Sequence, residues 1–240
     1  MKVDMVGNGW MAMIAGNAGK ARQLVANYRT TLNSEGLTID HANIHDHLSM
    51  APRLQRRKLV EDYIQSKLSI SYETFLSDGK SILPEELHRQ ILWDVQAITL
   101  DCEIVLAGFI GTAPYVFSVW RDGSVSQAEA FVAVGSGATV AQAALFQRGF
   151  DGSLDIMEAL YYIYEAKRLS EVAPGVGQTT GMFVMLPSRR VGGDSAIFGI
   201  SLGAFESLNA QYRRFGLKAF KPTIGFGDLI PEDAEGKLIK

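Results

Sequence analysis

The chain has 240 residues and a mass of 26.2 kDa, which fits one large domain better than two. Its formal net charge of −3 lacks the basic excess of a nucleic-acid-binding protein, so we expect no nucleic-acid partner. A single cysteine excludes an intramolecular disulfide. The uncharged runs 104–120 and 130–147 are broken by glycine, proline or glutamine, so we expect no membrane span and a cytoplasmic location.

The chain begins with the pattern of a β-hairpin. Apolar runs at residues 2–6 and 10–15 flank Gly-Asn-Gly, whose residues accept positive φ and favour a tight turn. A helix is expected to follow over residues 17–35, because apolar side chains recur there with helical spacing. Those side chains are Ala21, Leu24, Val25, Tyr28 and Leu32.

Residues 37–52 are polar and rich in histidine, and we expect a loop there. His41, His45 and His47 have the spacing H-x3-H-x-H, and an i, i+4 pair on a helix can bind zinc. No apolar periodicity surrounds them and no cysteine is near, so a polar loop is favoured over a metal site, and no cofactor is expected. Helical patterns resume at residues 52–68 and, after Pro84, at residues 84–98.

The most informative pattern lies between Cys102 and Met185. Two strands joined by loops lead to a third strand that ends at Gly135-Ser136-Gly137, and two helices follow before the chain returns to a strand. The second helix begins with a capping box, Asp155 and Glu158. A last helix is expected at residues 202–215 and an irregular tail at 218–240. The expected strands are 102–111, 114–120, 129–134 and 182–186, and the paired helices are 138–149 and 155–170.

The strand at residues 115–120 is apolar on both faces, which is typical of a strand that lies between two covering layers. The strands cluster in sequence and the helices between them come in pairs. This arrangement favours an α+β fold of two packed antiparallel sheets covered by helices over a parallel βαβ fold.

The ordered motifs of residues 2–186 resemble proteasome β-type subunits, which belong to the N-terminal nucleophile (Ntn) hydrolases. The resemblance implies a four-layer αββα sandwich over residues 1–217, with helices 17–35 and 53–98 on one side and 138–149 and 155–170 on the other. It also implies hydrolysis of a peptide or amide substrate, by an N-terminal Thr, Ser or Cys whose own α-amine is the base. A homo-oligomer is the expected assembly.

Three residues match functional positions of that family. Ser136, in the family's A-x-G-S-G segment, would hold the α-amine of the nucleophile; without the resemblance, the same residues are simply a tight turn of small residues. Lys2, which opens the first strand, would supply the cation that lowers the proton affinity of the nucleophile. Glu171 stands where the family has an orienting acid, although Pro174-Gly175 replaces the family's Ser-Gly pair. We expect Ser136 and Lys2 to face a common cleft, with Glu171 at its margin.

The family places its nucleophile on a strand upstream of the lysine that Lys2 matches. Two explanations remain open: the protein begins upstream of Met1, or the chain is an N-terminally truncated, non-catalytic assembly subunit. The coexistence of Lys2, Ser136 and Glu171 favours the first. A polypeptide whose first residue is Met1 is expected to be inactive, because methionine offers no hydroxyl or thiol. A serine-hydrolase triad is a minor alternative, since no histidine lies in a strand-end loop that would pair with Ser136.

Overall fold

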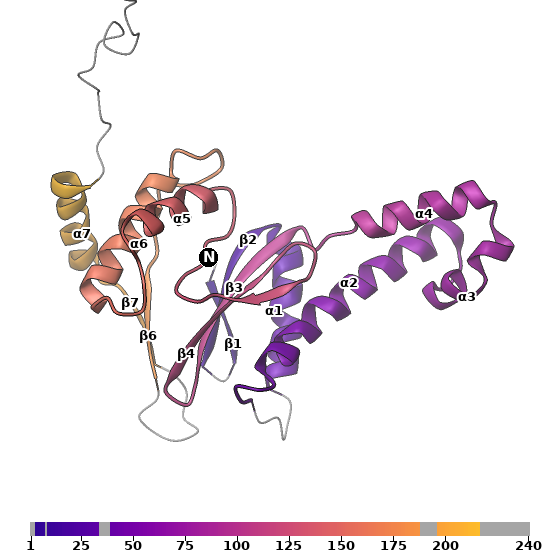
Figure 1. The fold of residues 1–240 in the computed structure, drawn as a ribbon, viewed down its shortest axis with the longest axis horizontal. Helices are drawn as coiled ribbons and strands as arrows, with labels where there is room; N and C mark the ends of the chain where they lie inside the picture. Colours follow the sequence, from indigo (N-terminus) through magenta and orange to yellow (C-terminus); the bar gives the residue numbers. More distant parts are fainter. Residues whose placement is uncertain (1–2, 8, 34–38, 188–195, 217–240) are drawn as a thin grey trace, which may run out of the picture. The chain divides into compact units, whose positions relative to one another are not determined.

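The structure is a computed structural model that describes residues 3–7, 9–33, 39–187 and 196–216. The chain divides into two units, Met1–Ser201 and Leu202–Lys240. In the described part of the first unit, helices accompany a five-stranded and a two-stranded antiparallel sheet (Figure 1). The fold class is therefore α+β with antiparallel sheets, as the sequence predicts. The expected irregular tail at 218–240 lies outside the described residues.

The five-stranded sheet is a meander in which each strand pairs antiparallel with the next one along the chain. The predicted hairpin at the start of the chain is present, and so is the one that turns through Asp122-Gly123. The strands are β1 (Val3–Gly7), β2 (Trp10–Gly16), β3 (Cys102–Ile110), β4 (Ala113–Val119) and β5 (Val125–Gln127).

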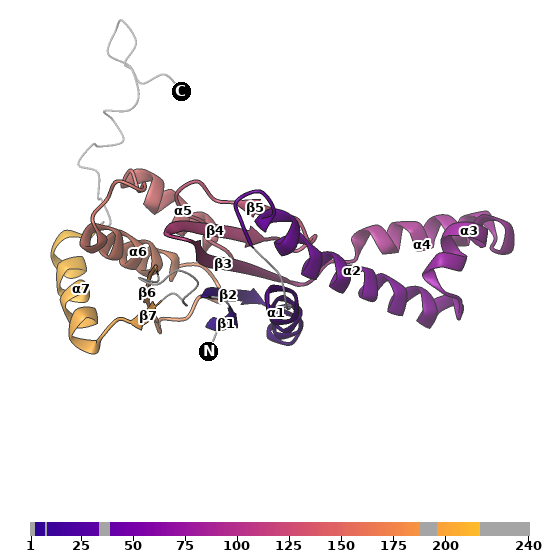
Figure 2. The same ribbon diagram turned by 90° about the horizontal axis from the view of Figure 1, so that it is seen from below.

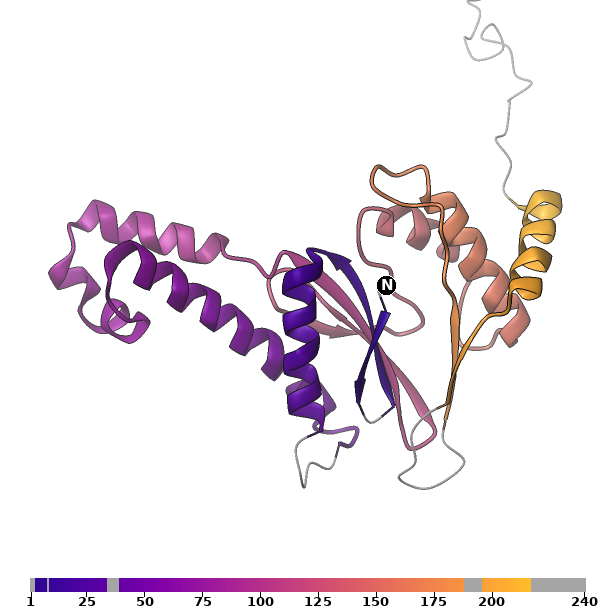
Figure 3. The same ribbon diagram turned by 180° about the vertical axis from the view of Figure 1, so that it is seen from behind.

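One face of this sheet is covered by α1 (Ala18–Leu32), which contacts β1, β2 and β3, and by α2 (Ile44–Leu68), which contacts α1 and β5 (Figures 2 and 3). All five side chains of the predicted stripe on α1 are buried. The Asn17 side chain caps the helix by accepting the N–H groups of Gly19 and Lys20. The main core therefore lies between this face and the two helices.

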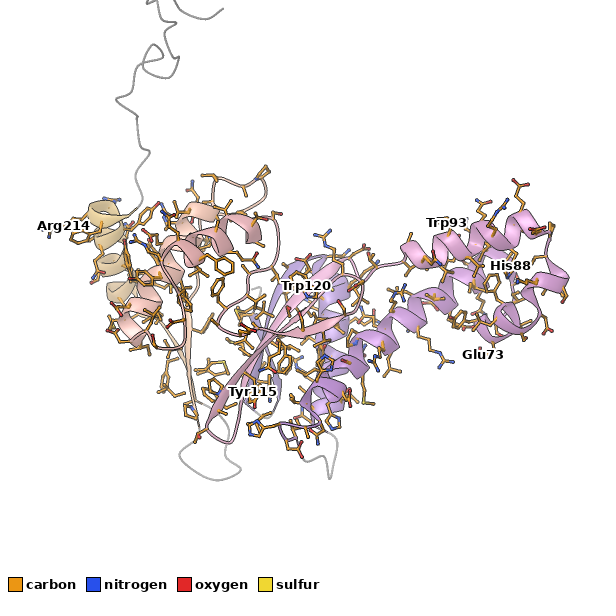
Figure 4. All side chains as sticks on the ribbon, viewed as in Figure 1. Glu73, His88, Trp93, Tyr115, Trp120 and Arg214 are labelled. Atoms are coloured by element: carbon orange, nitrogen blue, oxygen red, sulfur yellow. The ribbon has the colours of Figure 1, made fainter. Side chains whose placement is uncertain are left out.

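The helix α2 corrects two expectations. It begins at Ile44, so residues 44–52 are helical and the predicted loop is shorter, and Pro52 lies inside the helix rather than at its start. The sequence did not predict α3 (Tyr72–Ile82), which with α4 (Glu85–Ala97) and the second half of α2 encloses a separate core. His88 stacks on Phe75 in that core, and Trp93 is 69% exposed (Figure 4). The buried core residues are Val60, Ile64, Phe75 and Ile91.

The second face of the five-stranded sheet is also apolar. Met11 and Ala15 of β2 and Val105 of β3 alternate with the residues that face α1, and all three are buried. On β4 the side chain of Ser118 is buried on this face as well. Both faces of the sheet therefore carry buried side chains, which is the pattern expected of a sheet that lies between two layers.

The remaining elements of the first unit are α5 (Ala138–Gln147) and α6 (Ile156–Ser170), which pack on each other, and a small sheet of β6 (Phe183–Leu186) and β7 (Ala196–Gly199). Asp155 caps α6 as predicted, accepting the N–H groups of Met157 and Glu158. The second unit contains α7 (Leu202–Phe215), which has the predicted bounds.

The strand predicted before Ser136 is not formed. After β5 the Ala128 N–H still donates to the Val116 carbonyl oxygen, but residues 129–134 have no regular structure. Their sequence is strand-like, yet a strand needs a neighbouring backbone to bond to, and no strand among the described residues pairs with this segment.

Within the described ranges, no helix has both the length and the apolarity needed to cross a bilayer.

Candidate functional site

The turn Gly135-Ser136-Gly137 connects the irregular segment after β5 to the start of α5 (Figure 1). Gly135 has φ +90, a conformation that residues with a Cβ rarely adopt, and a Cβ at this position would lie 3.0 Å from the Ala15 Cβ. The Gly135 N–H donates to the Glu103 Oε2 at 2.8 Å. The turn is therefore held against the C-terminal end of β2 and the N-terminal end of β3.

The other side of the turn packs against the C-terminal end of α6. A Cβ at Gly137 would lie 2.8 Å from the Ser170 Cβ and 3.2 Å from the Ser170 carbonyl oxygen. A Cβ at Gly175 would lie 3.7 Å from the Ser136 Oγ. The structure thus brings Ser136 next to residues 170–176, the two segments that the sequence predicted to form one site. The Ser136 side chain is exposed there.

Replacing Gly137 with alanine should separate the turn from α6. The added methyl group cannot fit at 2.8 Å from another carbon, so either the turn or Ser170 must move, at a cost of about 1–3 kcal/mol in the free energy of unfolding. Urea denaturation followed by circular dichroism measures this cost. Gly152→Ala is the matched control, because a Cβ there meets no atom within 4 Å. Equal stability of the two variants would contradict the close contact.

Glu171 is the C-cap residue of α6, and its carboxylate is engaged by two cations. Lys167 Nζ lies 2.8 Å from Oε1, and Arg168 Nη1 lies 3.0 Å from Oε2. Lys167 Nζ also donates to the Gly177 carbonyl oxygen at 2.8 Å. The ion pairs of Glu171 therefore stabilise the end of α6 and the segment that follows it. This segment packs on the Ser136 turn, but both carboxylate oxygens of Glu171 are bound to Lys167 and Arg168.

Lys2 lies outside the described residues, so its predicted place in the cleft stays a prediction. Its neighbour in sequence, Val3, is the first residue of β1 and pairs with Met13 of β2. Met13 lies two residues before Ala15, which contacts Gly135. The start of β1 and the Ser136 turn are therefore at the same end of the sheet.

Ser136 is the exposed hydroxyl at this site, and His41, His45 and His88 contact other groups. His45 Nε2 donates to the Val125 carbonyl oxygen at 3.0 Å, the His41 ring bonds to the Tyr115 hydroxyl, and His88 stacks on Phe75. In the part of the chain that the structure describes, no group of three or more His, Cys, Asp or Glu side chains is arranged to hold a metal. His45 and His47 lie on α2 rather than in the predicted polar loop.

Cys102, the single thiol of the chain, is not suited to act as a nucleophile. Its side chain is buried at the start of β3, and desolvation raises the pKa of the thiol to about 11. The thiolate is the reactive form, so Cys102 is protonated and inert at neutral pH.

Sequence reasoning missed Glu103. It is the one charged residue of the strand Cys102–Ile110, and a charge within an otherwise apolar strand is a recognisable signal. Its Oε1 accepts the Arg121 Nε–H at 2.9 Å while Oε2 accepts the Gly135 N–H. Only the fold brings these three residues together.

Comparison with models of known protein families gives no match, and comparison with curated proteins gives none either. The resemblance to the proteasome β-type family therefore rests on the motifs of the sequence.

Proposed function

We propose that the chain is a proteasome-type Ntn hydrolase, an αββα protein that hydrolyses peptide or amide bonds with an N-terminal Thr, Ser or Cys. The observation that carries the proposal is the contact of the Ser136 turn with the C-terminal end of α6, through Gly137 and Ser170 and through Ser136 and Gly175. Sequence motifs alone indicate both segments as parts of one site.

The sheet architecture supports the sandwich. Five antiparallel strands carry α1 and α2 on one face, and the opposite face is apolar and holds Met11, Ala15 and Val105. An apolar sheet face calls for a further layer, and the strands β6 and β7 with the paired helices α5 and α6 are the elements that would supply it.

In this proposal each site residue has one role. The Ser136 hydroxyl, which can donate and accept hydrogen bonds, would hold the free α-amine of the nucleophile. The Lys2 ammonium would lower the pKa of that amine, because a nearby positive charge disfavours its protonated form. Glu171 would order the segment around Gly175 through its ion pairs with Lys167 and Arg168. The substrate would be a peptide or another amide, and the assembly a homo-oligomer in the cytoplasm.

A second candidate is a non-catalytic subunit of a proteasome-like assembly. The state of Glu171 favours it, since both carboxylate oxygens already bind cations of α6 and the side chain is only 10% exposed. A carboxylate that is bound in this way is not free to orient the amine of a nucleophile. In a non-catalytic subunit, Glu171 would serve only to stabilise the end of α6.

Hydrolysis of fluorogenic peptide amides distinguishes the two candidates. A form of the protein with a free Thr, Ser or Cys at the nucleophile position should release the fluorophore, and Ser136→Ala should lower its kcat by about 100-fold because the amine loses its positioning contact. Ser66→Ala, an exposed serine on α2, is the matched control. The rate should rise with pH until the α-amine is deprotonated, near or below about pH 8.

Two results would contradict the hydrolase proposal. Absence of turnover in every form, with the fold intact by circular dichroism, would leave the non-catalytic subunit. Robust turnover by a polypeptide whose first residue is Met1, abolished by Ser136→Ala, would instead make Ser136 itself the nucleophile.

A further inference from the structure

The carboxylate of Glu103 links strand β3 to the Gly135 turn, 32 residues further along the chain. Oε2 accepts the Gly135 N–H at 2.8 Å, and Oε1 accepts the Arg121 Nε–H at 2.9 Å. The Glu103 side chain is 15% exposed, whereas Arg121 is 60% exposed. A largely buried carboxylate needs such partners, and hydrogen bonds to an ionised acceptor are stronger than those between neutral groups.

The register of the sheet explains why the carboxylate reaches the turn. Glu103 pairs with Ala15 across β2 and β3, so both side chains stand on the same face of the sheet. A Cβ at Gly135 would lie 3.0 Å from the Ala15 Cβ, so the small side chain of Ala15 lets the turn approach the sheet. Glu103 then bonds the amide of the residue directly before Ser136.

We infer that Glu103 is a positioning residue, which fixes the Ser136 hydroxyl at the end of the sheet through its hydrogen bond to Gly135. Arg121 restrains the carboxylate by holding its second oxygen. The contact at Gly137 fixes the turn only from the α6 side, and Glu103 provides the restraint from the sheet side. The catalytic meaning of this position rests on the proposed function, but the restraint itself does not.

Amide hydrogen exchange and the NMR resonance of the Gly135 amide test the inference. In Glu103→Ala the protection of this amide should fall about tenfold or more, because a hydrogen bond to a charged acceptor is lost, and its proton resonance should move upfield. Glu103→Gln keeps an acceptor oxygen and should stay within about threefold of the parent protein. Arg121→Gln leaves both Glu103 oxygens in place and serves as the control for loss of the ion pair alone.

An unchanged Gly135 resonance and protection in Glu103→Ala would overturn the inference, and so would an equal loss in Glu103→Gln and Glu103→Ala. If the Ala variant does not fold, the Gln variant still tests the bond: its acceptor is neutral, so the Gly135 proton resonance should move upfield, and an unchanged resonance would overturn the inference. Hydrolysis is measured in the same variants. If the Gly135 signals change as expected while no form hydrolyses peptide amides, the positioning role stands and the proposed hydrolase function fails. If the hydrolase function holds, Glu103→Ala lowers kcat more than it changes KM, and Glu103→Gln restores most of it.

Discussion

Replacing Glu165 with alanine should lower the free energy of unfolding by about 3–5 kcal/mol, because it leaves the charge of Arg148 without its partner. The Glu165 side chain is fully buried on α6, and Arg148 reaches it from the end of α5 with two hydrogen bonds, of 2.6 and 2.7 Å. The hydrogen bonds that Arg148 donates to Glu165 raise the pKa of the guanidinium above its usual range. A guanidinium that has lost this partner is still protonated at neutral pH, so the charge stays after the change. Urea denaturation followed by circular dichroism measures the loss.

A double replacement separates the charge effect from packing. Arg148→Met together with Glu165→Leu removes both charges and fills a similar volume, so it should cost far less than Glu165→Ala alone and could stabilise the protein. Tyr162 lies beside the Arg148 guanidinium and belongs to the apolar cluster of α5 and α6, which suits methionine at that position. A Glu165→Ala cost below about 1 kcal/mol would show that the pair does not hold the two helices together.

Local sequence signals predicted much of the fold. The stripe on α1, the hairpin of β1 and β2 and the Asp155 cap each depend on residues within a few positions of one another, and all three were confirmed. The predicted start of α2 was wrong because His45, Asp46 and His47 give residues 44–52 the look of a polar loop. Ile44, Leu48 and Ala51 nevertheless have the i, i+4, i+7 spacing of one helix face, and they are buried in the main core.

Long-range partners account for the other differences. Residues 129–134 have the composition of a strand, but regular strand structure also requires a paired backbone, and composition does not specify one. On α6 the apolar Met157 is 64% exposed, whereas the charged Glu165 is buried by its pairing with Arg148. Burial of a charge depends on a partner from another helix, and no local pattern predicts it.

The residues of the candidate site also fall into those that local motifs predict and those that depend on long-range contacts. Ser136 and the segment around Glu171 were predicted from short motifs, and the structure brings these segments together. Glu103 was not predicted, because its role depends on the register of β2 and β3 and on the return of the chain at Gly135. The four-layer sandwich is a proposal, and so are the catalytic roles, which the hydrolysis of peptide amides tests.

Trp10 should be the most costly side chain to remove from the main core. It is 1% exposed and lies with its ring centre 6.1 Å from that of Phe117, and Trp10→Ala should lower the free energy of unfolding by about 3–5 kcal/mol through lost burial and the cavity left behind. The ring lies on Gly108 of β3, where an added Cβ would be only 2.3 Å from Trp10 Cδ2. Gly108→Ala should therefore cost about 1–3 kcal/mol by forcing the ring away.

The two positions should be strongly coupled, and the coupling tests the packing directly. In a Trp10→Leu background the smaller side chain leaves room for a methyl group, so Gly108→Ala should cost at least 1 kcal/mol less than it does beside tryptophan, a difference typical of residues in contact. Urea denaturation of the parent, the two single variants and the double variant gives the coupling energy. Gly152→Ala is the control for a glycine-to-alanine change without a steric clash, because a Cβ there meets no atom within 4 Å. Gly111→Ala is unsuitable, because the φ of +62 at Gly111 would strain an alanine. Additive costs would mean that the ring does not lie on Gly108. The result also bears on the candidate site. Trp10 and Gly108 pack together at one end of the β2–β3 pair, and Ala15 and Glu103 contact the Ser136 turn at the other end.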